Sequence, residues 1–307
     1  MSFERTYGYL RPRVTAHFTQ YELDRVGSSS ESRLIPMLHI DSRLFLDREL
    51  SYGDAAYEQG LDAKVYYAYI PFEDQQALPN FDSGEVGFDN ISNYYHRGRF
   101  YGGDRIGDTH RVTLGLETRV VEAATGYQRL HAELAQMIFF NDRRVRLGRN
   151  DLPLTQRYSN LLSEMTMGLN QNWSASAFVD WDWDQRAVSD FRLGVDYAKG
   201  ARWQLSTGYR YKTDDGHDEL SLDSTWPLGR RWQVGLRNIS RLDDKQNQYS
   251  SVSIGYDDCC WAIQVNVEDE WTDDDGPQVM FTLRLKGLGS ISSGEIARMY
   301  AATALTD

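Results

Sequence analysis

The sequence contains no long apolar run, and its 307 residues have a mean hydropathy of −0.58. This absence excludes a membrane-spanning helix, which needs about 20 consecutive apolar residues. It leaves a spanning β-strand open, because only every second residue of such a strand meets lipid. Basic residues are also in deficit, since 33 Lys and Arg face 45 Asp and Glu, for a net charge of −12. Nucleic-acid binding requires a basic surface, so we exclude that class.

Recognisable catalytic patterns are missing as well. The six histidines form no His-x-x-x-His pair, and neither a Gly-x-Ser-x-Gly elbow nor a phosphate-binding loop occurs. The acidic run Asp273–Gly276 lacks the alternating ligands and the closing Glu of a calcium loop, so we expect a solvated hairpin tip there. We therefore expect no metal, no cofactor and no enzymatic activity. A membrane-embedded hydrolase assembled from separate strands stays open as a minor alternative.

Alternation of apolar and polar residues dominates the chain. Between Trp173 and Asp184, apolar residues occupy every odd position, and polar residues occupy every even position except Phe178. A period of two is the geometry of a β-strand. On this reading one face of the later strands carries charges of both signs, which indicates a hydrated lumen: Asp180, Asp182, Arg192, Asp196, Arg210, Asp223, Arg237, Arg284 and Lys286.

The pattern predicts fourteen strands, which lie at about 7–20, 33–46, 61–71, 110–121, 127–140, 158–169, 173–184, 189–198, 202–213, 219–226, 231–241, 248–256, 260–270 and 278–287. Most are long enough to cross a bilayer when tilted. The 19 Tyr, 8 Trp and 12 Phe fit aromatic girdles at the two interfaces. We predict an all-β fold: about 14 strands of an antiparallel transmembrane β-barrel in the bacterial outer membrane. The alternative to a membrane barrel is a soluble, β-rich binding module.

Connection lengths suggest which side each turn faces. Barrels of this kind have short periplasmic turns and longer external loops. Counting back from the last strand makes Asp257–Cys259, Pro227–Arg230 and Lys199–Ala201 periplasmic, and all three are short. The same count places the long 71–109 connection on the external side, where long loops are expected. The connection 47–60 is the exception, because it is too long for the periplasmic side on which the count places it.

The two cysteines, Cys259 and Cys260, are adjacent and lie at a predicted periplasmic turn. The periplasm favours disulfides, but neighbouring residues pair with each other badly because a trans peptide holds their Cα atoms only about 3.8 Å apart. We expect each to bond a partner outside this chain, while a free thiol pair remains the alternative. The chain also opens directly into a strand with no secretory signal, so we expect it to be the C-terminal piece of a longer precursor.

Four segments resemble the LptD family of LPS-assembly proteins. The paired-cysteine turn Asp257–Ala262 (DDCCWA) and the long loop, with Leu78–Asp82 (LPNFD) and Arg99–Asp108 (RFYGGDRIGD), are specific in combination. Leu285–Ser290 (LKGLGS) resembles the family's final strand and exit, and Tyr9–Val14 (YLRPRV) is a weaker match. The resemblance covers the chain in order. The loop-motif residues are Asn80, Phe81, Asp82, Asp104, Arg105, Gly107 and Asp108.

The resemblance implies a translocon that assembles lipopolysaccharide into the outer leaflet, with a barrel of about 26 strands. It implies an LptE-like plug lipoprotein inside the barrel, and periplasmic transport-bridge proteins that contact an N-terminal domain absent from this sequence. It further implies that Cys259 and Cys260 bond distant cysteines in that absent region.

By the same resemblance, one side of a lateral gate is the final strand, with Val279, Phe281, Leu283, Leu285 and Gly287. Residues 1–290 would then be barrel strands and loops, and 291–307 a periplasmic tail. A diffusion porin or another self-contained barrel is the alternative, although a porin gives no reason for two thiols at one turn.

Overall fold

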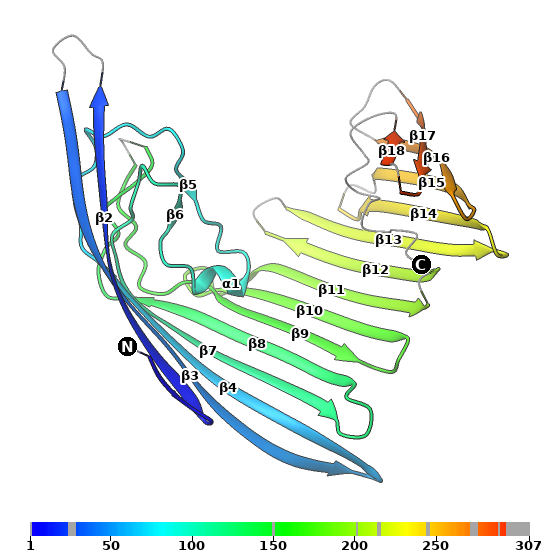
Figure 1. Cartoon of the computed structure of the whole chain (residues 1–307), viewed down its shortest axis with the longest axis horizontal. Helices are drawn as coiled ribbons and strands as arrows, with labels where there is room; N and C mark the ends of the chain where they lie inside the picture. Colours follow the sequence, from blue (N-terminus) through cyan, green and yellow to red (C-terminus); the bar gives the residue numbers. More distant parts are fainter. Residues whose placement is uncertain are drawn as a thin grey trace. The chain divides into compact units, whose positions relative to one another are not determined.

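The computed structural model describes residues 2–23, 29–148, 151–200, 202–213, 216–243, 246–270, 276–287 and 289–292 (Figure 1). The acidic run at Asp273–Asp275 and the tail beyond residue 292 lie outside these ranges. Within them, no helix is both long and apolar enough to cross a membrane. The chain divides into two compact units, residues 1–165 with 179–188 and residues 166–178 with 189–307.

Nearly all regular structure in the described residues is antiparallel strand. From the N-terminus to residue 168 the elements are β1 (Phe3–Arg5), β2 (Gly8–Leu23), β3 (Ser29–Tyr52), β4 (Ala55–Ile70), β5 (Gly84–Glu85), α1 (Ile91–Tyr94), β6 (Phe100–Tyr101), β7 (Thr109–Glu122), β8 (Gln128–Phe139) and β9 (Leu161–Gly168). The elements that follow are β10 (Trp173–Asp182), β11 (Ala187–Lys199), β12 (Trp203–Lys212), β13 (His217–Leu228), β14 (Trp232–Arg241), β15 (Asn247–Asp257), β16 (Trp261–Glu270), β17 (Gln278–Leu285) and β18 (Gly289–Ser292).

All fourteen predicted strands are confirmed, and their order along the sheet follows their order along the chain. The sheet has sixteen strands rather than fourteen, because two short edge strands, β1 and β18, escaped the alternation pattern. Strands of three and four residues are too short to show a period of two. The pair β5–β6 forms a separate small ribbon within the long loop.

Register aligns like residues across neighbouring strands and so creates two chemically different faces. In the second unit, Ile254, Val265 and Phe281 form one apolar row across β15, β16 and β17. The adjacent positions Gly255, Gln264 and Thr282 form a polar row on the opposite face. Successive residues of a strand point to opposite sides, so each strand presents an apolar face to lipid and a polar face to the interior.

The long connection predicted between 47 and 60 is a two-residue turn in the structure. Strands β3 and β4 extend beyond their predicted ends until Tyr52 pairs with Ala55. Gly53 occupies the first turn position with φ +61°, which glycine adopts without a Cβ penalty. The apparent exception to the rule of short periplasmic turns therefore came from underestimating strand length.

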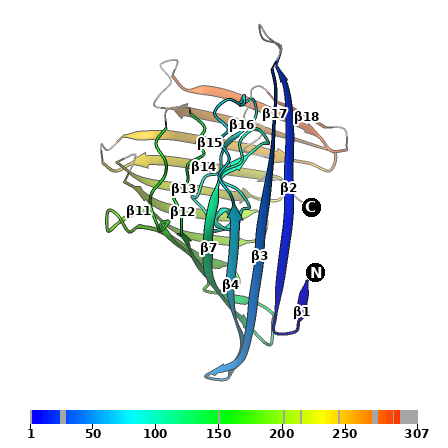
Figure 2. The same cartoon turned by 90° about the vertical axis from the view of Figure 1, so that its left-hand side faces the viewer.

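The connection between β4 and β7, residues 71–108, folds back over the polar face of the first unit (Figures 1 and 2). Its helix α1 begins at the N-cap Asn90, whose side chain accepts a hydrogen bond from the Asn93 N–H. The Lys64 ammonium of β4 lies 4.4 Å from the centre of the Tyr95 ring. Gly115 of β7 permits this approach, because a Cβ there would collide with the Tyr95 hydroxyl.

Candidate functional site: the loop, the cysteine turn and the polar strand face

Asp104 is the centre of the long loop. Its carboxylate accepts hydrogen bonds from the Tyr21 hydroxyl of β2 at 2.7 Å and from the backbone N–H groups of Phe81 and Asp82 at 2.5 and 2.9 Å. Burial alone would raise the pKa of this carboxyl, but the hydrogen bonds from Tyr21, Phe81 and Asp82 outweigh it and lower the pKa. An ionised carboxylate therefore ties the two halves of the loop to the sheet.

Asp82 makes the reciprocal connection. Its carboxylate accepts from the N–H groups of Gly103 and Asp104 at 3.1 and 3.2 Å. Gly102 has φ +81°, and a Cβ there would lie 2.5 Å from the Asp82 carbonyl oxygen, so only glycine fits. Asn80 closes a local turn by accepting from the Ser83 N–H at 3.0 Å.

The remaining motif residues anchor the loop through backbone carbonyls and a second loop. Arg105 donates to the carbonyls of Leu78 and Pro79, both at 2.9 Å. Asp108 accepts from the N–H groups of Arg144 and Val145 at 2.9 and 2.8 Å. The structure thus brings the two predicted motif segments together, and it shows the side chains of Asp82, Asp104, Arg105 and Asp108 holding the loop.

Several residues at this site gave no signal in the sequence. Arg33 of β3 is buried and donates to the Asp104 carbonyl at 2.6 Å and to the Gln75 side chain. Thr113 of β7 donates to the Tyr94 carbonyl, and Tyr94 donates to the Asn160 carbonyl, both at 2.9 Å. The alternation pattern places Arg33 and Thr113 on the polar face, but it carries no information on which loop atoms they meet.

A charged cluster lies on the same polar face, on β7 and β8. Glu117, His131 and Glu133 offer three possible metal ligands close together. Arg43 lies 2.8 Å from Glu117, and Lys64 lies 3.1 Å from Glu133. The carboxylates are therefore already compensated by cations, and this geometry gives no reason to expect a metal.

Cys259 and Cys260 lie in the turn between β15 and β16. Both are exposed, and no disulfide joins them. The turn is closed by a hydrogen bond from the Asp258 N–H to the Trp261 carbonyl at 2.9 Å. A hydrogen bond between the two thiols raises the pKa of Cys259. Both sulfurs are thus accessible to partners outside the chain.

The predicted gate strand ends sooner than expected. β17 stops at Leu285, and Gly287 lies in the following turn with φ +88°, a conformation incompatible with a strand. Val279 and Phe281 are 66% and 59% exposed on the apolar face. β17 is not the last strand either, because β18 pairs with it from Thr282 to Leu285.

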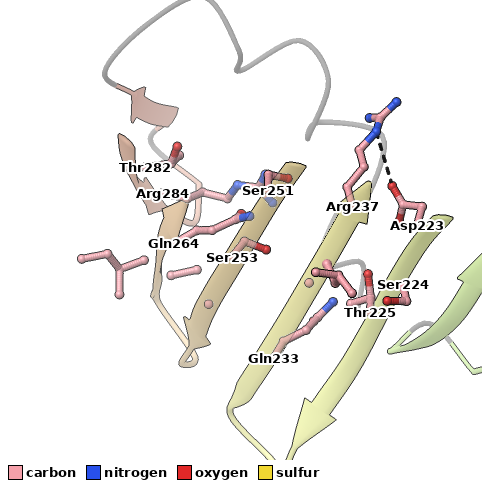
Figure 3. Close-up of a pocket in the computed structure, with 15 residues that line it drawn as sticks. Asp223, Ser224, Thr225, Gln233, Arg237, Ser251, Ser253, Gln264, Thr282 and Arg284 are labelled. Atoms are coloured by element: carbon pink, nitrogen blue, oxygen red, sulfur yellow. Dashed lines mark ion pairs between the residues drawn. The ribbon is translucent and has the colours of Figure 1, made fainter. Parts of the chain in front are cut away.

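The second unit has a groove along the polar face of β13 to β17 (Figure 3). Small residues such as Gly235, Ser253 and Gly255 leave the space. Arg237 and Asp223, which are register partners on β14 and β13, form an ion pair at 3.9 Å along the groove, and Arg284 and Gln264 also line it. The groove has charges of both signs and no convergent catalytic group.

Comparison with known proteins agrees with this architecture. Residues 1–232 match the family model described as LptD, LPS transport system D. The LPS-assembly protein LptD of Nitrosomonas europaea is 32% identical over 270 residues, which cover 86% of this chain and 37% of that protein. The LptD of Thiobacillus denitrificans is 31% identical over 304 residues, covering 96% of this chain and 41% of that protein.

The chain thus spans about two fifths of the length of the curated relatives it matches. A solved mutant of the Rh. blastica porin aligns with 93% of the chain and 94% of that porin at 11% identity, with a TM-score of 0.38, which is too weak to bear on the fold. The sequence relatives and the antiparallel sheet with its apolar face carry the assignment. The chain belongs to the LptD family and forms part of an outer-membrane β-barrel.

Proposed function

We propose that this chain supplies the C-terminal barrel portion of a translocon that places lipopolysaccharide in the outer leaflet, and that it transports rather than catalyses. The family match over residues 1–232 carries the proposal. The two strand faces support it, because lipopolysaccharide has charged sugars that require a polar path and acyl chains that require lipid. The apolar row through Ile254 and Phe281 and the polar row through Gln264 and Thr282 offer both environments.

An LptE-like lipoprotein inside the barrel, periplasmic bridge proteins and a lateral gate at the sheet edge formed by β17 and β18 are parts of the same proposal. The exposed turn at Cys259 and Cys260 supports a covalent link to the rest of the protein. In the full-length protein, the double substitution Cys259→Ser and Cys260→Ser should abolish long-range disulfides and shift mobility on a non-reducing gel. Unchanged mobility would contradict the link.

Depletion of the full-length protein in its host tests the function. Lipopolysaccharide detected on intact cells with an antibody should fall, while total lipopolysaccharide in lysed cells should not. A control strain depleted of an unrelated outer-membrane barrel should keep its surface signal. If surface lipopolysaccharide persists while uptake of small solutes drops, the chain belongs to a diffusion pore instead.

A further inference from the structure

Four tryptophans of the second unit lie at the start of a strand. Trp173, Trp203, Trp232 and Trp261 are the first residues of β10, β12, β14 and β16, and they are 37%, 44%, 44% and 39% exposed. All four strands start at the end of the sheet that the turn lengths predict to be periplasmic. Exposed indole rings at corresponding positions of a barrel mark the level of the lipid headgroups, so the turns beside them lie at headgroup depth.

Two neighbouring turns at this end are joined by an arginine. Arg202 lies in the turn between β11 and β12, and its Nη1 donates to the carbonyls of Gly229 and Arg230 in the turn between β13 and β14, at 3.0 and 2.7 Å. Its Nη2 donates to the Trp232 carbonyl at 2.8 Å. The two turns therefore form one surface, with the Arg202 guanidinium between them.

Two more cations belong to this surface. Lys199 ends β11, is exposed, and is the register partner of Trp203, so its side chain leaves the same outer face of the sheet as that ring. Arg230 is an exposed residue of the second turn. Among the described residues, neither Lys199 nor Arg230 forms an ion pair, and the three acceptors of Arg202 are neutral carbonyls. The positive charge of these three side chains is thus not compensated within the described part of the chain.

The next turn along the sheet contains carboxylates, but they are already paired. Asp258 lies 3.4 Å from the guanidinium of Arg231, and Asp257 lies 2.7 Å from the ammonium of Lys286. These two pairs cancel each other's charges and leave Lys199, Arg202 and Arg230 as an excess of cations.

The connections at the opposite end of the same strands have the reverse charge. The connections 213–216, 242–246 and 271–277 contain seven Asp and one Lys, whereas the turns 200–202 and 229–231 contain three Arg and no acidic residue. The whole chain is acidic, with a net charge of −12. A basic surface confined to one end of an acidic unit favours an anionic partner at that end alone.

We propose that the surface formed by Lys199, Arg202, Arg230 and the rings of Trp203 and Trp232 binds an anionic phospholipid of the inner leaflet. Its phosphate diester supplies the negative charge that these cations lack, and guanidinium groups are preferred partners of phosphate. The indole rings pack against the glycerol backbone and the first acyl carbons at the same depth. A zwitterionic phospholipid is disfavoured, because its ammonium group brings a like charge to the cations. The proposal uses the outer-membrane barrel and the predicted side of the turns, and it does not depend on transport of lipopolysaccharide.

Lipid retention by the full-length protein tests the site. The protein, in non-ionic detergent, is incubated with equimolar phosphatidylglycerol and phosphatidylethanolamine of identical acyl chains and repurified, and the retained lipids are quantified by mass spectrometry. The unmodified protein should retain phosphatidylglycerol in excess. The double substitution Lys199→Gln and Arg230→Gln should lower the ratio of the two lipids about fivefold for each charge removed, as expected from the attraction of one basic residue to an anionic membrane surface. Both side chains are exposed, so we expect folding to be unaffected.

Arg241→Gln is the matched control, because it removes a cation from the opposite end of β14, where Arg241 pairs with Asp243 at 2.8 Å. Its lipid ratio should equal that of the unmodified protein. Higher salt during incubation should lower the ratio of the unmodified protein toward that of the double variant, because exposed charges are screened. The proposal is overturned if the unmodified protein retains both lipids equally, or if the double variant keeps the ratio of the Arg241→Gln control. The assay involves no transport, so its outcome is separate from that of the depletion experiment.

Discussion

The two compact units share one strand pattern but treat their polar faces differently. In the first unit the loop 71–108 covers the polar face, and Tyr94 of the loop is buried, as are Met137 of β8 and Leu162 of β9. In the second unit the connections between strands are at most seven residues long, and the polar face carries a groove lined by Arg237, Arg284 and their neighbours. Among the described apolar residues, only Phe178 and Ala262 of that unit are buried.

This difference shows that alternation sets the faces of a strand, whereas the connections decide whether a face is buried. Charges on the covered face must find partners, as Arg33 does with loop carbonyls. Charges on the open face can remain hydrated, as the 49% exposed side chain of Asp223 does. Substitutions of the same chemistry should therefore cost different amounts in the two units.

The largest contrast should come from a pair of aspartates. Asp104→Ala in the first unit should destabilise the docked loop by about 3 to 5 kcal/mol, because it leaves the Tyr21 hydroxyl and two part-buried N–H groups without their charged acceptor. Asp223→Ala in the second unit should cost less than about 1 kcal/mol, since its ion pair is long and solvated. Denaturant unfolding with limited proteolysis of the loop measures both. Equal costs would remove the distinction between the units.

A lipid-facing pair should instead behave alike in both units. Leu283→Arg in β17 and Val65→Arg in β4 should each cost about 2 to 4 kcal/mol near the bilayer midplane, because neither apolar face depends on a loop. Thr282→Arg, on the polar face of β17, is the control and should cost much less. Unfolding in lipid bilayers gives the values. A cost at Thr282 that matches Leu283 would overturn the assignment of faces.

Two glycines with nearly the same backbone conformation test how much steric crowding adds to the cost of a Gly→Ala substitution. Gly102 of the loop and Gly229 of a second-unit turn have nearly equal φ, +81° and +82°. A Cβ at Gly102 meets the Asp82 carbonyl, whereas at Gly229 nothing lies within 4 Å. Gly102→Ala should cost about 2 to 3 kcal/mol and Gly229→Ala about 1 kcal/mol, the strain of positive φ alone. Thermal unfolding compares them, and a larger cost at Gly229 would contradict the packing of the loop.

Acid should loosen the first unit selectively. The lowered pKa of Asp104 means that its contribution to stability is complete above its ordinary value of 3.8 and is lost as the pH falls through the lower folded value. Protease cleavage within 71–108 should therefore rise below that value, with little change in second-unit turns. The Asp104→Ala variant should show no such pH dependence, and if it does, another group is responsible.

Particular residues show how far the sequence could be interpreted. The alternation between Trp173 and Asp184 predicted β10 to within two residues. It missed the ends of β3 and β4, because Arg48 and Gln59 interrupt the apolar face while backbone pairing continues through them. The motif at Asp104 and Arg105 could be recognised, but its role could not be deduced, because its partners are backbone N–H and carbonyl groups that any residue possesses.

The sequence alone determined the all-β class, the positions of the long strands, the placement of Cys259 and Cys260 in one turn, and the family. These features are local, since each depends on a period of two or on a short motif. Only the tertiary structure decided that residues 71–108 lie on the polar face and that Asp104 accepts a hydrogen bond from Tyr21. Such contacts join residues far apart in the chain, so their energies depend on a geometry that no local pattern encodes.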